Sequence, residues 1–298
     1  MRTPLFSRNQ PGGVFSIVDV PAHPGSIFFV HSGTGTNAAG YGDNPDKPVA
    51  TIDYAIGLCT ADKGDVIYVM PGHAETIINA TGLVPDVAGV SIIGLGQGRQ
   101  RPTITFGTAT TANIPVSAAN VTLKNLVLLS GFDDIAAAIT VTGAGCTIDG
   151  CEFDETAVNK NFLICILGGS AATADNLLVQ NCRCVQRDAA NTHFVSLPGT
   201  TRNARILRNS ISGDFGTAAI GAAGVVIFGE VSDNYIYNAA SDNDSCINLA
   251  GTGICVRNLV ASAAAQANQI TATLWALNQN YAGVISEDLN GILEPIAT

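Results

Sequence analysis

The chain has 298 residues, a formal net charge of −10 and a sequence pI near 4.6, and only 13% of its residues are charged. An acidic chain lacks the clustered Lys and Arg that neutralise phosphate, which argues against a nucleic-acid-binding protein and against binding to an anionic membrane surface. No run of about 18 apolar residues predicts a transmembrane helix, and the N-terminal residues have no apolar segment typical of a signal peptide. We therefore expect a protein made in the cytoplasm, without membrane association.

Residues 1–26 are punctuated by proline and glycine, and Val14 to Val20 has the composition of one short strand. A segment of this kind rarely packs well alone. We expect an N-terminal arm that lies on a partner or on the body of the molecule, with Phe15 and Val18 as candidate contact residues. A disordered tail is the alternative.

The next segment predicts a strand followed by a cap. Ile27 to Val30 is apolar, and after a turn-rich loop the apolar residues of the 48–60 segment have helical spacing. Thr51 precedes this run as a candidate N-cap, and Gly64 is expected to end it. A short helix here would cover the open end of the first coil, where an uncovered strand edge presents unpaired backbone groups.

Six similar segments between residues 120 and 259 form an internal repeat. Each has an apolar residue, a polar residue, an Asn or Gly, and a second alternating run. The predicted turn residues are Asn125, Gly150, Asn181, Asn209, Asn234 and Asn258. Their separations of 25, 31, 28, 25 and 24 residues are typical of stacked repeats. Asn and Gly tolerate the left-handed backbone conformation that a sharp bend needs.

A third short apolar run lies between successive units, so each coil contains three short strands. This pattern predicts an all-β protein with a right-handed, single-stranded parallel β-helix over residues 27–260, followed by a C-terminal strand or arm over 261–298. A leucine-rich repeat lacks support because its leucine spacing is absent, and a propeller blade needs about 40 residues or more. The residues expected to point inward are Leu123, Ile148, Val179, Ile206 and Val256.

Short motifs near the start of the chain carry a family resemblance. They are Gly40 to Pro48, Ala50-Thr51-Ile52, Gly64-Asp65, Pro71-Gly72 and Ile92-Ile93-Gly94. From about Phe28 to Leu259 the chain resembles pectate-lyase-like β-helix proteins, many of which are bacteriophage virion components. The resemblance implies the fold, but this fold hosts lyases, hydrolases and inert structural proteins alike.

The eight cysteines fall mostly at inward-pointing strand positions, which favours small buried hydrophobic side chains stacked in the interior. A disulfide ladder is the alternative and needs an oxidising compartment. No Cys-x-x-Cys pair with a nearby His supports zinc, and no motif supports another cofactor.

The densest acidic cluster contains Asp149, Glu152, Asp154 and Glu155. Glycoside hydrolysis needs two carboxylates at a fixed separation, so Asp149, Glu152 and Asp154 are the catalytic candidates if the protein is an enzyme. A calcium site or a solvated polar face are the other interpretations. The Gly-His-Gly and Arg-Ile-Lys motifs of polygalacturonase-type hydrolases are absent, so we expect no catalytic residues.

Aromatic residues are few. Tyr235 and Tyr237 share one face of a predicted strand and are the best pair for stacking on a ligand, or else for packing against a neighbouring subunit. Trp275, the one Trp of the sequence, lies in the predicted C-terminal strand and is a further candidate contact residue.

Two functions remain. The first is a non-enzymatic phage virion protein on the exterior of the particle, a capsid decoration, cement or spike subunit. It would form a homotrimer and bind the major capsid protein or another virion protein. The alternative is a polysaccharide-degrading tailspike, a glycoside hydrolase or lyase, for which a host surface glycan is the partner.

Overall fold

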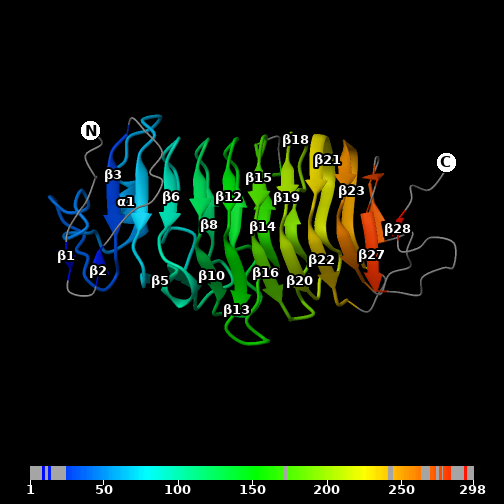
Figure 1. Cartoon of the computed structure of the whole chain (residues 1–298), viewed down its shortest axis with the longest axis horizontal. Helices are drawn as coiled ribbons and strands as arrows, with labels where there is room; N and C mark the ends of the chain where they lie inside the picture. Colours follow the sequence, from blue (N-terminus) through cyan, green and yellow to red (C-terminus); the bar gives the residue numbers. More distant parts are fainter. Residues whose placement is uncertain are drawn as a thin grey trace.

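The computed structural model describes residues 9–10, 13–14, 25–170, 173–240, 244–262, 269–272, 275–276, 278–282 and 292–293. These residues form a right-handed parallel β-helix of about 8 turns, with very little helix. Figure 1 shows the strands stacked side by side along the long axis of the molecule, in chain order from β3 to β27. The predicted fold class is confirmed.

One side of the body is a ten-stranded sheet, parallel except for its last pair. In spatial order its strands are β5 (Ala74–Ile77), β7 (Thr103–Phe106), β10 (Val127–Ser130), β13 (Glu152–Glu155), β16 (Arg183–Gln186), β20 (Ser210–Gly213), β22 (Tyr235–Asn238), β24 (Leu259–Ala261), β27 (Asn278–Ala282) and β28 (Ile292–Leu293).

The other two sides belong to a single sixteen-stranded sheet. One side contains β3 (Ile27–Val30), β4 (Val66–Val69), β6 (Ser91–Gly94), β9 (Thr122–Lys124), β12 (Thr147–Asp149), β15 (Leu178–Gln180) and β19 (Arg205–Leu207). The other contains β8 (Ile114–Val116), β11 (Ile139–Val141), β14 (Ile164–Gly168) and β17 (His193–Ser196). The remaining strands are β18 (Thr201–Arg202), β21 (Ala218–Ser232), β23 (Ser245–Val256), β25 (Ile270–Thr271) and β26 (Trp275–Ala276). The two rows join because β21 pairs with β17 through its first half and with β19 through its second half.

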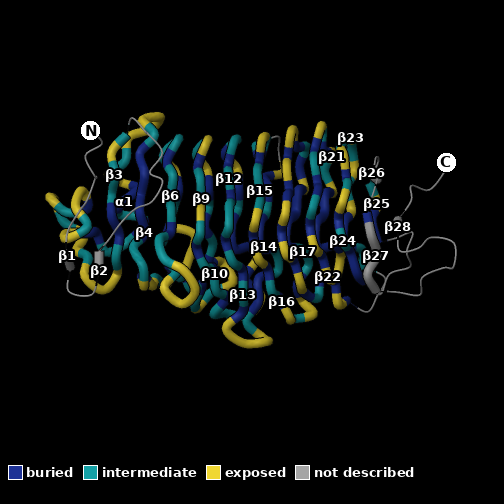
Figure 2. Tube along the Cα trace, viewed as in Figure 1, coloured by how far each residue is buried: buried dark blue, intermediate teal, exposed yellow. Residues whose placement is uncertain are grey.

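The core is the interior of this three-sided coil. In Figure 2 buried positions, dark blue, alternate along the strands with less buried ones, because every second side chain points inward. Neighbouring coils are in register, so equivalent inward residues form a continuous row. One such row contains Leu123, Ile148, Val179, Ile206, Val231 and Cys255, all buried. The prediction that Val256 points inward is wrong. Val256 is half-buried, because Cys255 is the residue in register with Val231.

The sharp bends between the two sheets lie one residue earlier than predicted in the last three coils. The left-handed residues are Asn125, Gly150, Asn181, Arg208, Asp233 and Arg257, with φ between 53° and 63°. Asn209, Asn234 and Asn258 follow the bends and are buried. The bend position faces solvent, so a charged residue can occupy it when its side chain is paired. Arg257, for example, donates to Asp233 at 2.8 Å.

The buried asparagines form a ladder that continues to Asn278. The Oδ1 atoms of Asn234, Asn258 and Asn278 each accept hydrogen bonds from the main-chain N–H and the Nδ2 of the preceding asparagine, at 2.8 to 3.0 Å. The Oδ1 of Asn209, the first of the ladder, accepts from the main-chain N–H of Cys182 at 2.9 Å. Each Nδ2 also donates to a main-chain carbonyl, which for Asn234 is that of Ile206 at 2.9 Å. The amides are at most 1% exposed, so this mutual pairing removes the cost of burying them. In the earlier coils the same position is filled by Leu126, Cys151 and Cys182.

The N-terminal end of the body is capped as expected. Helix α1 (Ile52–Ile56) buries Ile52, Ala55 and Ile56, and the Thr51 side chain accepts a hydrogen bond from the main-chain N–H of Tyr54. The helix ends at Ile56 with Gly57 as its C-cap, so the prediction that it extends to Gly64 is wrong. The free edge of β3 is covered by the following loop, because Phe29 exchanges main-chain hydrogen bonds with Gly42 and Val49.

The predicted arms fall largely outside the described residues. Within residues 1–26, β1 (Asn9–Gln10) and β2 (Gly13–Val14) pair antiparallel. The predicted strand from Val14 to Val20, with Phe15 and Val18, otherwise lies outside the described part of the chain. No helix among the described residues has the length and apolarity to cross a membrane.

The cysteines occupy the interior, as predicted. All eight are free thiols, and every one except the half-buried Cys59 is buried. Burial raises the pKa of the Cys146, Cys246 and Cys255 thiols to about 12. A reactive thiol needs a lowered pKa and access to solvent, so these cysteines act as small apolar residues.

A second column of left-handed residues marks the turn that precedes the β9 row. It contains Gly89, Asn120, Gly145, Asn176, Asn203 and Phe228, with φ between 55° and 74°. The first five are the residue types that tolerate this conformation, and each main-chain N–H donates to the next coil. Phe228 breaks the rule, and its side chain is 78% exposed. Its backbone strain is therefore not compensated by burial of the ring.

We predict that Asn234→Ala destabilises the protein by about 2 to 4 kcal/mol, because it leaves the main-chain N–H of Asn209 and the carbonyl of Ile206 buried without their partners. Urea unfolding followed by circular dichroism measures the change. The exposed strand residue Asn248 provides a matched control, since Asn248→Ala should change stability by less than about 0.5 kcal/mol. Equal effects of the two substitutions would contradict a stabilising role for the ladder.

Replacing Phe228 should raise the stability of the protein, whereas Asn234→Ala should lower it. We predict that Phe228→Asn stabilises the protein by about 1 kcal/mol, since asparagine tolerates the left-handed conformation and little apolar burial is lost. The converse change in the preceding coil, Asn203→Phe, should destabilise it. Urea midpoints of both variants test this, and a loss of stability in Phe228→Asn would show that the ring contributes to the fold.

Candidate functional site on the outer face of the ten-stranded sheet

The in-register strands arrange the outward side chains of the ten-stranded sheet in rows. The first row runs Thr103, Val127, Glu152, Arg183, Ser210, Tyr235 and Leu259. A second row includes Leu129 and Asp154 at one end and Ser212, Tyr237 and Ala261 at the other. The stacking therefore brings two of the predicted acids, Glu152 and Asp154, onto one face with the predicted tyrosines, although about 80 residues separate them in sequence.

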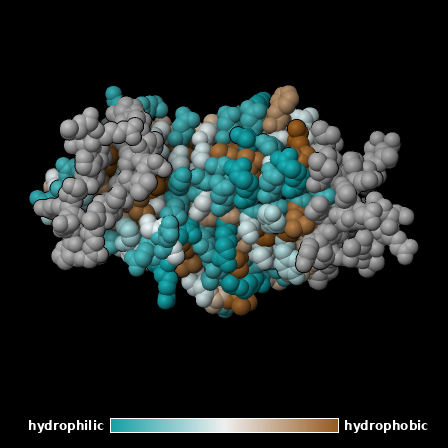
Figure 3. Space-filling view, viewed as in Figure 1, coloured by the Kyte–Doolittle hydropathy of each residue, from teal (hydrophilic) through white to brown (hydrophobic). Residues whose placement is uncertain are grey.

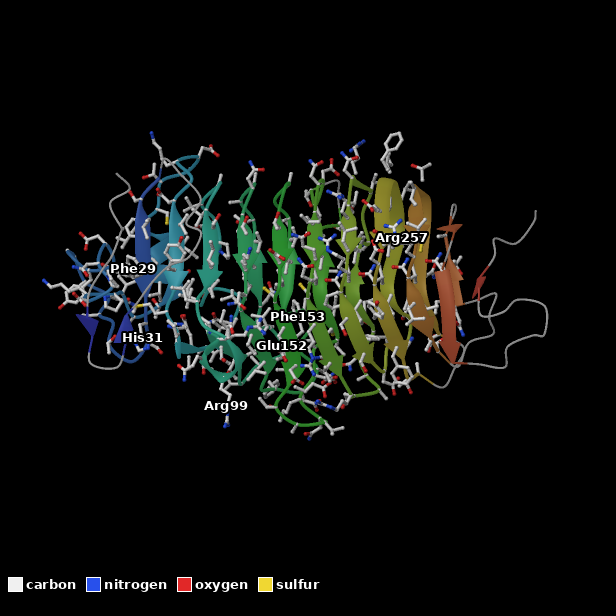
Figure 4. The ribbon with its side chains drawn as sticks, in the orientation of Figure 1. Phe29, His31, Arg99, Glu152, Phe153 and Arg257 are labelled. Carbon is white, nitrogen blue, oxygen red and sulfur yellow. The ribbon has the colours of Figure 1, made fainter. Side chains whose placement is uncertain are left out.

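Glu152 lies between two arginines, Arg183 of the following coil and Arg101, which lies two coils before it. Its Oε2 accepts from Arg101 Nη1 at 2.8 Å, and its Oε1 accepts from Arg183 Nη1. Arg101 is largely buried and also donates to the main-chain carbonyls of Leu126 and Gly150. Figure 4 shows Glu152 near the middle of the body. Both carboxylate oxygens are engaged, so Glu152 links its own coil to the following coil through Arg183 and to the coil two before it through Arg101.

The other two candidate acids have separate partners. Asp149 ends β12 on the far side of the bend at Gly150, where its carboxylate accepts from Lys124 Nζ at 3.1 Å and from Asn181 Nδ2 at 2.7 Å. Asp154 lies on the same face as Glu152 and pairs with Arg187 Nη1 at 3.4 Å. The structure thus brings Glu152 and Asp154 onto one surface and separates Asp149 from them. Their catalytic assignment stays a prediction.

Glu155 belongs to the acidic cluster by sequence but points into the body. Glu152 and Asp154 face outward, as predicted, and the alternation of β13 places Glu155 inward beside Phe153. Its side chain is 0% exposed and accepts hydrogen bonds from the main-chain N–H groups of Arg187 and Asp188. Burial raises the pKa of this carboxyl above its usual value, and the two N–H donors oppose that shift. The period of two along the strand could have identified Glu155 as inward from the sequence.

The two tyrosines border an open groove of about 350 Å³. Tyr235 is 64% exposed and Tyr237 is 52% exposed, so both rings stand outward on the same face, as the sequence predicted. The groove is lined by Ser210, Ile211, Ser212, Tyr235, Ile236, Tyr237, Leu259, Val260 and Ala261. None of these nine residues is charged. Figure 3 shows hydrophobic patches interrupting a largely hydrophilic surface on the side of the molecule in view.

A His–Glu pair at the N-terminal end of the body was not predicted. His73 is buried and its Nε2 lies 3.2 Å from Glu75 Oε2, while its Nδ1 accepts from the main-chain N–H of Ser32 at 3.0 Å. The Ser32 hydroxyl itself accepts from the main-chain N–H of Ala74. Because a backbone donor occupies Nδ1, this His cannot take a proton from Ser32 there, and the group anchors the capping loop.

Trp275 is the remaining contact candidate from the sequence. Trp275 begins β26, which pairs with β23, and its side chain lies outside the described part of the structure. His193 is partly buried in β17, and burial lowers its pKa to about 4. Across the described residues, no group of three His, Cys, Asp or Glu side chains is arranged to hold a metal ion.

Comparison with known proteins gives a likeness of fold. Neither a family model nor a curated protein matches the chain. A solved structure described as a rhamnogalacturonan lyase aligns with 80% of this chain and 69% of its own, at 15% sequence identity and a TM-score of 0.48.

Glu155 gives a pH-dependent prediction. A raised pKa in the folded state means that folding favours the protonated carboxyl, so this contribution to stability is present below the ordinary value of 4.5 and is lost as pH rises through the folded-state pKa. We predict that Glu155→Gln is more stable than the natural protein at pH 7 and that the difference disappears near pH 4. Urea midpoints across this range measure it. The outward Asp154→Asn serves as control, and a Gln variant less stable at pH 7 would contradict the prediction.

Proposed function

We propose that this protein is a non-enzymatic structural subunit of a bacteriophage virion, on the exterior of the particle as a decoration, cement or spike protein. The placement in a virion derives from the resemblance of the segment from about Phe28 to Leu259 to pectate-lyase-like β-helix proteins, many of which are bacteriophage virion components. The absence of enzymatic activity is supported by one observation, the engagement of both Glu152 oxygens by arginines of other coils, Arg101 and Arg183.

Glycoside hydrolysis requires one carboxyl group that can give a proton and another that can attack the sugar or activate water. Glu152 has neither oxygen free, and Asp149 and Asp154 each pair with a cation of an adjacent coil. These acids serve as ties between coils, a role that needs their charge but no substrate. Such pairs on a surface contribute little individually, yet opposite charges in one row avoid the repulsion of stacked like charges.

In this proposal the body is a homotrimer attached to the major capsid protein or another virion protein. Extended arms can add strands to exposed edges or lie in grooves of a neighbour, which buries a large surface per residue. Residues 1–26, with Phe15 and Val18, and the C-terminal segment with Trp275 are the proposed contacts.

A second candidate function is a polysaccharide-degrading tailspike. The groove beside Tyr235 and Tyr237 favours it, because exposed aromatic rings suit the flat faces of sugars. In that case Asp149, Glu152 and Asp154 would carry the chemistry, and Glu152 would have to leave its two arginines.

The test compares attachment with cleavage. We expect the chain lacking residues 1–26 to keep its β-strand circular dichroism but to lose binding to undecorated particles, measured as occupancy by electron microscopy. Natural protein incubated with host polysaccharide should release neither reducing sugar nor unsaturated product. Product that disappears in the Asp149→Asn, Glu152→Gln and Asp154→Asn triple variant would replace the proposal by the tailspike function. Full occupancy by the truncated chain would reject the arm as the attachment segment.

A further inference from the structure

We propose that Tyr235, Tyr237, Ser210 and Ser212 form a binding site for a neutral glycan on the outer face of the ten-stranded sheet. The inference goes beyond the proposed virion function and does not depend on it, because it concerns a ligand of the β-helix body itself.

The geometry provides a two-ring platform. The tyrosines are two residues apart on β22, which at about 3.3 Å per residue places their Cα atoms roughly 6.6 Å apart along the strand. Ser210 and Ser212 lie beside them on β20, and Leu259 and Ala261 lie beside them on β24. Three of these four neighbours are small, so both rings remain more than half exposed. A rigid parallel sheet holds the platform without the entropy loss that ordering a loop would require.

The chemistry of the groove matches a sugar. The C–H face of a pyranose packs on an aromatic ring, while its hydroxyls need donors and acceptors around that ring. Tyr and Ser hydroxyls both donate and accept. None of these four hydroxyls makes a hydrogen bond to another described residue, whereas the sheet backbone around them is paired with β20 and β24. The groove therefore presents apolar rings and unused hydroxyls together.

The charges select a neutral ligand. No lining residue of the groove is charged, and Arg183, which continues the row beyond Ser210, is already paired with Glu152. A uronic acid polymer would bring carboxylates that need Arg or Lys at the site. A neutral hexose polymer has no charge that needs a cationic partner, so the lack of Arg and Lys in the groove does not weaken its binding. The same lack of positive charge argues against a nucleic acid stacked on the rings.

A proline-rich peptide is the main competing occupant, since aromatic grooves also bind polyproline helices. A polyproline peptide offers carbonyl acceptors but no donors, whereas the hydroxyls of a sugar can both donate to and accept from the Tyr and Ser hydroxyls. The hydroxyls of Ser210 and Ser212 on β20 therefore favour a glycan as the ligand. Binding of a proline-rich peptide is one outcome of the test.

The experiment measures binding of the full chain to immobilised dextran, mannan, galactan and polygalacturonate, and to a soluble polyproline peptide. We expect one or more neutral polymers to bind, and Tyr235→Ala and Tyr237→Ala each to weaken the affinity about tenfold, roughly 1.4 kcal/mol. Tyr→Phe at the same positions should weaken the affinity less than Tyr→Ala, since the aromatic ring is kept. Phe228→Ala is the matched control, because it removes an exposed aromatic side chain outside the groove and should leave affinity unchanged.

Four results would overturn the proposal. They are binding of polygalacturonate alone, binding of polyproline that depends on the tyrosines, glycan binding that the double Tyr→Ala variant keeps, and no binding to any of the three neutral polymers. Circular dichroism of each variant establishes that the fold is intact. Particle occupancy, measured in parallel, separates the outcome from that of the virion function, because the tyrosines lie outside the proposed arms.

Discussion

The constraint on which this structure depends is the in-register stacking of parallel coils. Each residue lies over the equivalent residue of the next coil, at the strand spacing of about 4.8 Å. Equivalent positions of successive coils therefore form a row of adjacent side chains. A residue type suits such a position only if copies of it can lie next to one another. Apolar rows satisfy this condition directly. A buried polar row satisfies it only when its members pair with one another, as Asn209, Asn234, Asn258 and Asn278 do.

The same constraint explains how the few charged residues are used. Stacked like charges would repel, so the outer rows alternate in sign or insert a neutral residue. Lys124 pairs with Asp149, Arg205 with Glu230, and Arg257 with Asp233, each across neighbouring coils. Glu152 extends this pattern to two arginines at once. The acidic cluster that suggests catalysis in the sequence is, in the fold, a part of this cross-coil pairing.

Residues that do not follow the pattern of their row are concentrated in the last coils. Most of the large apolar side chains that the described residues expose, Val225, Phe228, Tyr235, Tyr237 and Ile254, lie there. Phe228 combines exposure with a left-handed backbone that its row otherwise assigns to Gly or Asn. Residues that break a local rule without a gain in packing mark positions kept for another reason. The C-terminal coils are accordingly where contacts with a ligand or another molecule are expected.

The sequence by itself determined the coil period, the capping helix start at Thr51, and the outward placement of Glu152, Asp154, Tyr235 and Tyr237. These follow from local rules, the period of two in a strand and the preference of an N-cap. The one-residue position of the later bends required the tertiary structure. In Arg208-Asn209 and Asp233-Asn234, local propensity gives the left-handed position to asparagine. Stacking places the asparagine inside instead, because its amide finds its partners only in the adjacent coils. The pairing of Glu152 with Arg101 and Arg183, 51 and 31 residues away, likewise exists only once the coils are stacked.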